Sequence, residues 1–162
     1  MTRVCVGIGS NIEPEQNIRD GLTELRRRFG PLTASTVYAN AAVGFAGADF
    51  LNLAVRFDSD RPVRAVAAAL REIEARHQPR VGNAKFVSRA LDLDLLLYGD
   101  LVLREPGIRV PRDEITRYAF VLRPLAEIAG DRRHPLLGVS FAELWANFDQ
   151  SRETLRPVTL AL

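Results

Sequence analysis

Two aspartates inside a leucine run, Asp92 and Asp94, are the residues with the clearest chemical potential. They alternate with leucines in the stretch LDLDLLLY. Side chains of a strand alternate between its faces, so both carboxylates would lie on one face and the leucines on the other. Two like charges side by side are unfavourable without a compensating cation. One interpretation is therefore a site for a divalent cation such as Mg²⁺, which takes one or two carboxylates and completes its shell with water and phosphate. The other is a polar sheet face with arginine partners.

Basic residues surround this pair in the sequence. Arg80, Lys85 and Arg89 precede it in a polar segment, whereas Arg112 and Arg117 follow the next apolar stretch. A nucleoside triphosphate and its magnesium need both carboxylates and positive side chains that contact phosphate. The combination favours a nucleoside triphosphate site, although each arginine taken alone is better explained as a solvated surface charge.

Phe50 and Asn52 form a second alternating pair. A half-buried aromatic ring beside an edge amide is the structural interpretation. The functional one is a stacking surface and an amide for a flat heterocycle, to which Phe86 and Phe120 could add aromatic area. The sequence contains neither a P-loop nor a Rossmann glycine motif.

A sheet with helices on its faces must position these side chains. Apolar patterns predict four strands and two long helices in the order β-α-β-β-α-β, followed by a hairpin and further helices. The predicted strands cover 3–9, 32–40, 50–59 and 90–100, and the two helices cover 13–30 and 61–77. The hairpin covers 101–111, a turn and a helix follow over 112–130, and a short last helix covers 140–148. This order matches the split βαβ motif. We therefore expect one α+β domain over residues 1–162, ferredoxin-like, with a mainly antiparallel sheet in a three-layer α-β-α arrangement.

Composition limits the classes of protein to consider. The 162 residues suit one domain, and the formal charge of +2 gives no case for nucleic acid. The single cysteine, Cys5, is expected to be a buried thiol, and no apolar run reaches the ~20 residues of a membrane span. His77 and His134 have no partner at metal-ligand spacing and are expected on the surface. We expect a cytoplasmic protein with no nucleic-acid or membrane partner.

Over nearly its whole length the sequence resembles the 6-hydroxymethyl-7,8-dihydropterin pyrophosphokinase family of folate biosynthesis. The resemblance lies in the segments VGIGSN, FLNLAV, LREIE and AFVLRPLAEIA, and above all in KFVSRALDLDLLLYGD. It implies a domain that binds ATP, two Mg²⁺ ions and a hydroxymethyl dihydropterin. It also implies transfer of diphosphate from ATP to the pterin hydroxymethyl group with release of AMP. On this resemblance the partners are the two small-molecule substrates, and we expect a monomer.

The resemblance implies roles for individual residues. The catalytic set is Asp92, Asp94 and Arg89, with the two aspartates as magnesium ligands. The pterin-binding set is Asn40, Val43, Phe50, Asn52 and Phe120. The ATP-binding set is Arg71, Glu74, Lys85, Arg89, Leu95, Arg112 and Arg117. The segment 78–88 corresponds to a loop that closes over ATP.

The sequence departs from the family pattern in its pterin segment, in its catalytic loop and after the dipeptide Val110-Pro111. Arg112 stands where a histidine is usual and Tyr118 where an arginine is usual. We expect Arg112 and Arg117 to supply the missing positive charge; the alternative for Arg117 is a surface ion pair with a neighbouring carboxylate. Two other functions stay open. One is a divergent paralogue acting on a different pterin, in a modified-folate or methanopterin-type pathway. The other is a non-catalytic pterin- or nucleotide-binding protein on the same fold.

Overall fold

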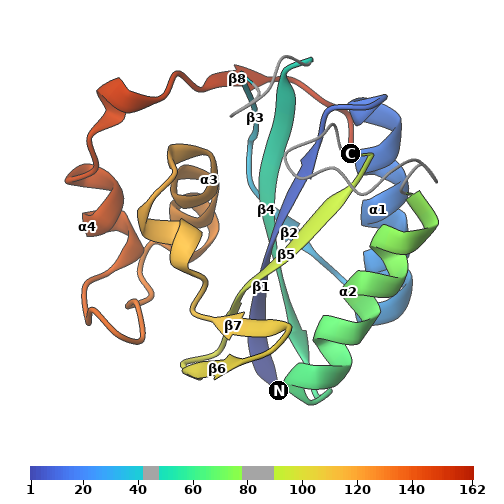
Figure 1. Ribbon diagram of the computed structural model, residues 1–162, viewed down its shortest axis with the longest axis horizontal. Helices are drawn as coiled ribbons and strands as arrows, with labels where there is room; N and C mark the ends of the chain where they lie inside the picture. The colour runs from blue at the N-terminus through green and yellow to red at the C-terminus, as the bar shows by residue number, and fades with distance from the viewer. Residues whose placement is uncertain (42–47, 78–89) are drawn as a thin grey trace.

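An antiparallel sheet lies between two layers of helices (Figure 1). The computed structural model describes residues 1–41, 48–77 and 90–162. Helices α1 (Pro14–Phe29) and α2 (Val63–His77) cover one face of the sheet, and α3 (Ala119–Ala129) and α4 (Phe141–Ala146) lie on the side of the other face. The three-layer α-β-α arrangement expected from the sequence is confirmed.

The strand order identifies the ferredoxin-like topology. The sheet runs β5-β1-β4-β3-β8, with β2 also paired to β4, and every pairing is antiparallel. Two helices cross between the four main strands, after β1 and after β4, as the split βαβ motif requires. The strands are β1 (Thr2–Ser10), β2 (Thr33–Ala34), β3 (Val37–Asn40), β4 (Phe50–Ser59), β5 (Asp92–Tyr98) and β8 (Arg156–Val158).

Each face of the sheet has its own apolar core. Leu93 and Leu95 of β5 are buried in the core beneath α1 and α2, as the alternation of leucine and aspartate predicts. Leu96 and Cys5 belong to the second core, which α3 and α4 complete. The pairing of β1 with β5 shifts between Cys5 and Val6, which places a bulge in β5 at Leu96. Burial raises the pKa of the Cys5 thiol to about 11, so the expectation of an inert core cysteine is confirmed.

Several local predictions need correction. The strand expected over 32–40 is two short strands, because Ser35 interrupts it and bonds to Ala54 through both its backbone amide and its hydroxyl. His134 is buried and not on the surface: its Nδ1 accepts the amides of Leu136 and Leu137 at 3.1 and 3.2 Å. The hairpin around Pro106-Gly107 is confirmed as β6 (Leu103–Glu105) and β7 (Ile108–Val110).

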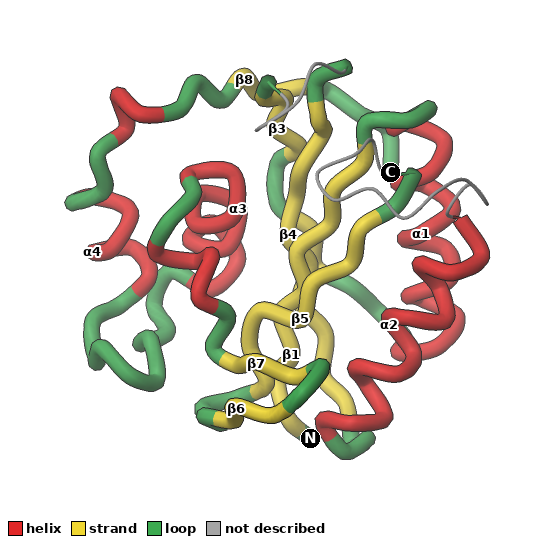
Figure 2. Tube along the Cα trace, in the orientation of Figure 1, coloured by secondary structure: helices red, strands yellow, loops and turns green. Residues whose placement is uncertain are grey.

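The C-terminal segment joins both sides of the molecule. It leaves α4, passes through the short 3₁₀ helix η2 (Gln150–Arg152), and forms β8 at the outer edge of β3 (Figure 2). Its end lies against α1, where the Ala161 carbonyl accepts a hydrogen bond from Arg19 Nε at 2.9 Å. Strand β8 was not expected from the sequence, since its three residues carry no alternating pattern. Over the part of the chain described, no helix is both long enough and apolar enough to cross a membrane.

Candidate functional site

The strand register places the two aspartates and Asn52 on the same face of the sheet. Asp94 pairs with Gly7 of β1, and Asp92 pairs with Gly9. On the other side of β1, Gly9 pairs with Asn52 of β4. Paired residues of neighbouring strands point to the same face, so the carboxylates and the amide share one surface with only glycines between them.

Gly7 and Gly9 keep this surface open. A Cβ atom at Gly9 would lie 2.8 Å from Asn52 Oδ1, closer than any side chain tolerates, whereas a Cβ at Gly7 would meet only Leu96, at 3.4 Å. The sequence placed Gly9 at the end of the predicted strand 3–9 and did not indicate this role. The available signal was the alternation of Gly7 and Gly9 in an otherwise apolar strand.

Three residues of the predicted pterin-binding set lie together beside these glycines. The Asn52 side chain donates from Nδ2 to Asn40 Oδ1, and both amides are buried. Phe50 pairs with Asn40 across β3 and β4, so its half-buried ring belongs to the same face. Because Asn40 uses the Nδ2 donor of Asn52, the Oδ1 acceptor that lies over Gly9 is held in a fixed orientation.

Phe120 comes from a different element. It is the second residue of α3, in the layer that covers this face, and its ring stacks on Tyr118 with centroids 5.0 Å apart. Val43, the remaining member of the predicted pterin-binding set, lies outside the described residues.

A cleft of about 720 Å³ runs along the outer edge of β5. Its volume is within the range of small-molecule sites. Its walls are α2, the β6–β7 turn and the 3₁₀ helix η1 (Asp113–Thr116). It is lined by both aspartates and by the five predicted ATP-binding residues that the structure describes, Arg71, Glu74, Leu95, Arg112 and Arg117. Lys85, Arg89 and the segment 78–88 lie outside the described residues.

Two polar contacts connect α2 to the other walls of the cleft. Glu74 Oε2 accepts the backbone amide of Leu93 at 2.9 Å, which satisfies an edge donor of β5. Arg71 Nη2 donates to the Gly107 carbonyl at 2.6 Å, at the tip of the β6–β7 turn. Both residues therefore have structural partners in addition to their exposure to the cleft.

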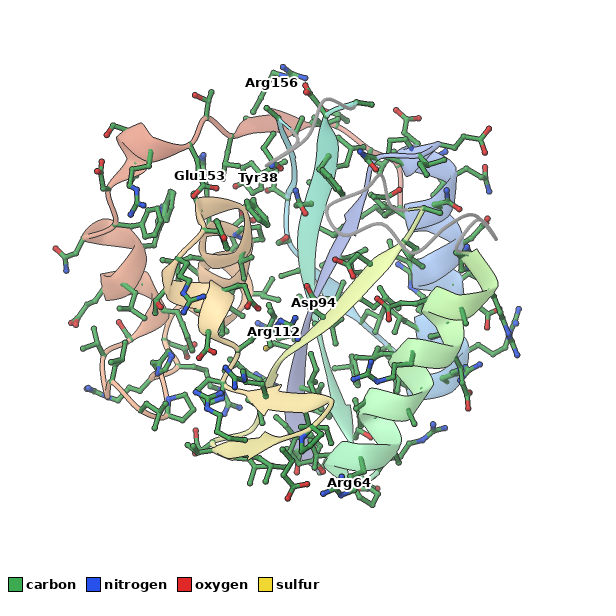
Figure 3. The ribbon with its side chains drawn as sticks, viewed as in Figure 1. Tyr38, Arg64, Asp94, Arg112, Glu153 and Arg156 are labelled. Atoms are coloured by element: carbon green, nitrogen blue, oxygen red, sulfur yellow. The ribbon has the colours of Figure 1, made fainter. Side chains whose placement is uncertain are left out.

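Arg112 is the nearest described cation to the aspartate pair (Figure 3). Its Nη2 lies 3.5 Å from Asp94 Oδ1, its Nε donates to Glu114 Oε2 at 2.5 Å, and its backbone amide donates to the Leu96 carbonyl at 3.0 Å. Burial disfavours the charged guanidinium, but the carboxylates of Asp94, Glu114 and Asp92 outweigh burial and raise the pKa of Arg112. A permanent positive charge is therefore held next to the two carboxylates, in the cleft.

Arg117 has no such fixed position. The expected alternative, a pair with Asp113 or Glu114, is not formed at ion-pair distance: Asp113 pairs with Arg104 and Arg109, and Glu114 pairs with Arg112. Arg117 is nevertheless near enough to contribute, after Arg109 and Arg104, to the lowered pKa of Asp113. Within the described ranges the guanidinium of Arg117 forms no ion pair, and the side chain is exposed at the cleft. It can therefore turn toward an anion without first breaking a salt bridge.

Asp92 and Asp94 suit a magnesium ion that also binds a ligand. Residues 1–41, 48–77 and 90–162 contain no group of three or more acidic, histidine or cysteine side chains arranged to hold a metal. Two half-exposed carboxylates at the edge of a cleft with arginines match a hard cation that takes one or two carboxylates and completes its shell with water and phosphate.

Comparisons with known proteins identify the family of this sequence. The profile of the family described as 7,8-dihydro-6-hydroxymethylpterin-pyrophosphokinase (HPPK) matches residues 5–130. A 2-amino-4-hydroxy-6-hydroxymethyldihydropteridine pyrophosphokinase of Pseudomonas aeruginosa is 35% identical over 137 residues, covering 82% of this chain and 84% of the relative. The enzyme of the same name from Synechocystis is 32% identical over 147 residues, covering 89% of this chain and 75% of the relative.

Solved structures support the fold. A crystal structure of HPPK-DHPS in complex with substrates aligns with a TM-score of 0.71 over 93% of this chain, at 10% identity. HPPK-DHPS of Plasmodium falciparum aligns with a TM-score of 0.65 over 90% of this chain, at 11% identity. The chain spans 44% and 43% of the lengths of these two proteins, so each likeness concerns one part of a longer chain.

Proposed function

Because the chain belongs to the 7,8-dihydro-6-hydroxymethylpterin-pyrophosphokinase family, we propose that it transfers diphosphate from ATP to 6-hydroxymethyl-7,8-dihydropterin, in folate biosynthesis. In this reaction the hydroxymethyl oxygen attacks the β-phosphorus of ATP, the bond from that phosphorus to the α-phosphate oxygen breaks, and AMP leaves. The chain is thus an ATP-dependent diphosphotransferase.

The observation that carries the proposal is the arrangement of Asp92, Gly9 and Asn52 across three neighbouring strands. Strands of a sheet lie about 4.8 Å apart, so roughly 10 Å separates the strand with the carboxylates from the strand with the amide. Gly9 itself adds no side chain to that span, and the side chains nearest to a Cβ position there are those of Asn52 and Phe50. A flat heterocycle at Asn52 and a phosphate chain at the aspartates would therefore meet above Gly9.

The pterin end is assigned to Asn40, Asn52, Phe50 and Phe120. Asn52 Oδ1 can accept a hydrogen bond from an N–H group of the heterocycle, because the bond from Asn52 Nδ2 to Asn40 orients the amide with its oxygen over Gly9. The ring of Phe50 provides a stacking surface on the sheet, and Phe120 provides one from the helix layer. We assign Val43 to the rim of this pocket by the family pattern.

The ATP end is assigned to the cleft along β5. Asp92 and Asp94 would hold magnesium, two ions in the full proposal, and bound magnesium supplies charge stabilisation for the transferred phosphates. Arg112 would exchange its contact with Asp94 for a phosphate oxygen when ATP binds. Arg71, Glu74 and Leu95 would contact the nucleoside, and Arg117 the phosphates. Lys85 and Arg89 are assigned to the phosphates by the family pattern, and the segment 78–88 as a loop that closes over ATP.

The exchange of Arg112 has a simple electrostatic reason. Arg112 offsets the repulsion between Asp94 and its neighbour Asp92. Asp92 and Asp94 would hold magnesium, whose charge would take over that offset, and Arg112 would then be able to contact phosphate. Glu114, which accepts a hydrogen bond from Nε, would keep the guanidinium in the cleft during the exchange.

The assay that tests the proposal compares three proteins. Wild type, Asp94→Asn and the matched control Asp100→Asn are incubated with ATP, Mg²⁺ and 6-hydroxymethyl-7,8-dihydropterin, and AMP is measured. Asp100 is an exposed aspartate just after β5, outside the cleft lining. We expect AMP from wild type and from the control, and a rate at least about 100-fold lower from Asp94→Asn. Absence of AMP from wild type would refute the proposal.

Replacing the substrate with a different hydroxymethyl pterin separates the alternatives. A divergent paralogue would release AMP from ATP only with the different pterin, and a binding protein would bind pterin without releasing AMP. We also propose that the protein is a monomer, which light scattering would test.

We place the protein in the reducing cytoplasm, which is consistent with its single, buried cysteine, Cys5.

A further inference from the structure

The first turn of α3 has an unusual cap. Leu122 and Val121 donate their backbone amides to the Tyr118 carbonyl, at 3.0 and 3.1 Å. The first two backbone amides of the helix, those of Ala119 and Phe120, donate to no backbone carbonyl, and the side chain of the N-cap residue Tyr118 accepts no hydrogen bond from them. Helix N-termini leave such donors unsatisfied unless another group accepts them.

Both of these amides donate to one distant carboxylate. Glu153 Oε2 accepts the amide of Ala119 at 2.7 Å, and Glu153 Oε1 accepts the amide of Phe120 at 3.4 Å. The helix has no acidic residue of its own in its first turn, so Glu153 also provides the negative charge that a helix N-terminus favours. Glu153 thereby fixes the backbone of Phe120 directly.

The same C-terminal segment also holds strand β3. Three residues after Glu153, Arg156 begins β8 and pairs with Ala39, the residue before Asn40 (Figure 3). Strand β8 covers the outer edge of β3, and the half-buried Val158 opposite Val37 adds an apolar contact. Residues 153–158 are therefore bonded to the start of α3 at one end and to the strand of Asn40 at the other.

We propose that Glu153 is a positioning residue for the pterin pocket: it sets Phe120, from the helix layer, against the sheet residues Phe50 and Asn40. This rests on the proposed function, which assigns those three residues to the pterin. The family profile ends at residue 130, so the inference gives a role to a segment that the family match does not cover. Loss of the Glu153 carboxylate releases the two amides and lets the first turn of α3 unwind, which moves the Phe120 ring.

The inference predicts a selective defect. Glu153→Ala raises the KM for the pterin at least about fivefold, and the KM for ATP stays within about twofold, because the cleft along β5 makes no contact with Glu153. Glu153→Gln retains an acceptor oxygen and gives an intermediate value. The matched control, Glu143→Ala, removes an exposed carboxylate whose oxygens accept no hydrogen bond in the described structure, and it leaves both KM values unchanged.

A second measurement does not depend on activity. Hydrogen exchange of the Ala119 and Phe120 amides becomes faster in Glu153→Ala and not in Glu143→Ala, since only the former removes their acceptor.

The outcomes separate the two proposals. A wild-type protein that releases no AMP counts against the proposed function, whereas the exchange experiment still tests the contact. An active wild type with an unchanged pterin KM in Glu153→Ala overturns the inference. Equal rises of the pterin and ATP KM values, with a lower Tm, also overturn it, since they show general destabilisation.

Discussion

Replacing Gly9 by alanine adds one methyl group at the centre of the proposed site. The new Cβ would lie 2.8 Å from Asn52 Oδ1 and 3.8 Å from Phe50 Cδ1. The backbone at Gly9 needs no positive φ, so the substitution introduces no backbone strain and slightly restricts the unfolded chain. The Asn52 amide has to move, and its buried bond to Asn40 is lost or weakened.

The size of the effect follows from the hydrogen bond that the proposed function assigns to Asn52 Oδ1 and an N–H group of the heterocycle. If Oδ1 is displaced, that N–H group is buried in the complex without an acceptor, which costs about 1–3 kcal/mol of binding free energy. Since each 1.4 kcal/mol corresponds to a factor of about ten in affinity, the pterin Kd should rise by about five- to 150-fold. Gly7 is the matched control, because a methyl group there meets only the flexible Leu96 side chain at 3.4 Å. Gly7→Ala should keep the pterin Kd within about threefold of wild type.

The assay is a fluorescence titration of the pterin, with a parallel titration of a non-hydrolysable ATP analogue in Mg²⁺. Gly9→Ala should lose pterin affinity, keep affinity for the ATP analogue and keep its Tm within a few degrees. If Gly9→Ala and Gly7→Ala bind pterin equally well, the open surface above Gly9 is not where the heterocycle lies.

Further predictions concern the charges of the cleft and one buried histidine. Asp92→Asn, like Asp94→Asn, should lower turnover by at least about 100-fold without unfolding the protein, which activity and Tm measured together would show. Arg112→Ala should weaken ATP binding by about tenfold or more, as for a lost charge-assisted hydrogen bond, whereas Arg117→Ala should cost only about threefold; equal, wild-type affinities would contradict the assignment. Burial, and secondarily Arg104, lower the pKa of His134 in the folded protein. The unfolded chain therefore takes up this proton first as pH falls, so Tm should decrease below about pH 6.5, and His134→Asn should reduce that slope.

The sequence was sufficient to predict the main helices and strands and the placement of Asp92 and Asp94 on one face of a strand. The reason is that local apolar patterns determine both. The alternation of leucine and aspartate from Leu91 to Leu95 has a single solution at the edge of the sheet, with the leucines facing α1 and α2 and the carboxylates facing the side of α3. Helices α1 and α2 were predicted well because their apolar residues recur at helical spacing. The five described residues of the predicted ATP-binding set were assigned by resemblance, and all of them line one cleft.

The features that the sequence could not provide depend on long-range pairing. The role of Gly9 is visible only when Asn52 is known to be its neighbour across the strand. Strand β8 forms because the edge of β3 is available, and not because Arg156–Val158 favours a strand. The Glu153 cap joins residues 33 and 34 positions apart, and no local motif records such a contact.

The most direct test of the account is the fate of labelled phosphate in a single reaction. Wild-type protein, Mg²⁺, 6-hydroxymethyl-7,8-dihydropterin and ATP labelled separately at the β- or the γ-phosphorus are incubated, and the pterin product and the nucleotide are separated. Transfer of an intact diphosphate predicts both labels in the pterin product and unlabelled AMP as the nucleotide. Appearance of the γ-label alone in the product, with ADP retaining the β-label, would contradict the central claim.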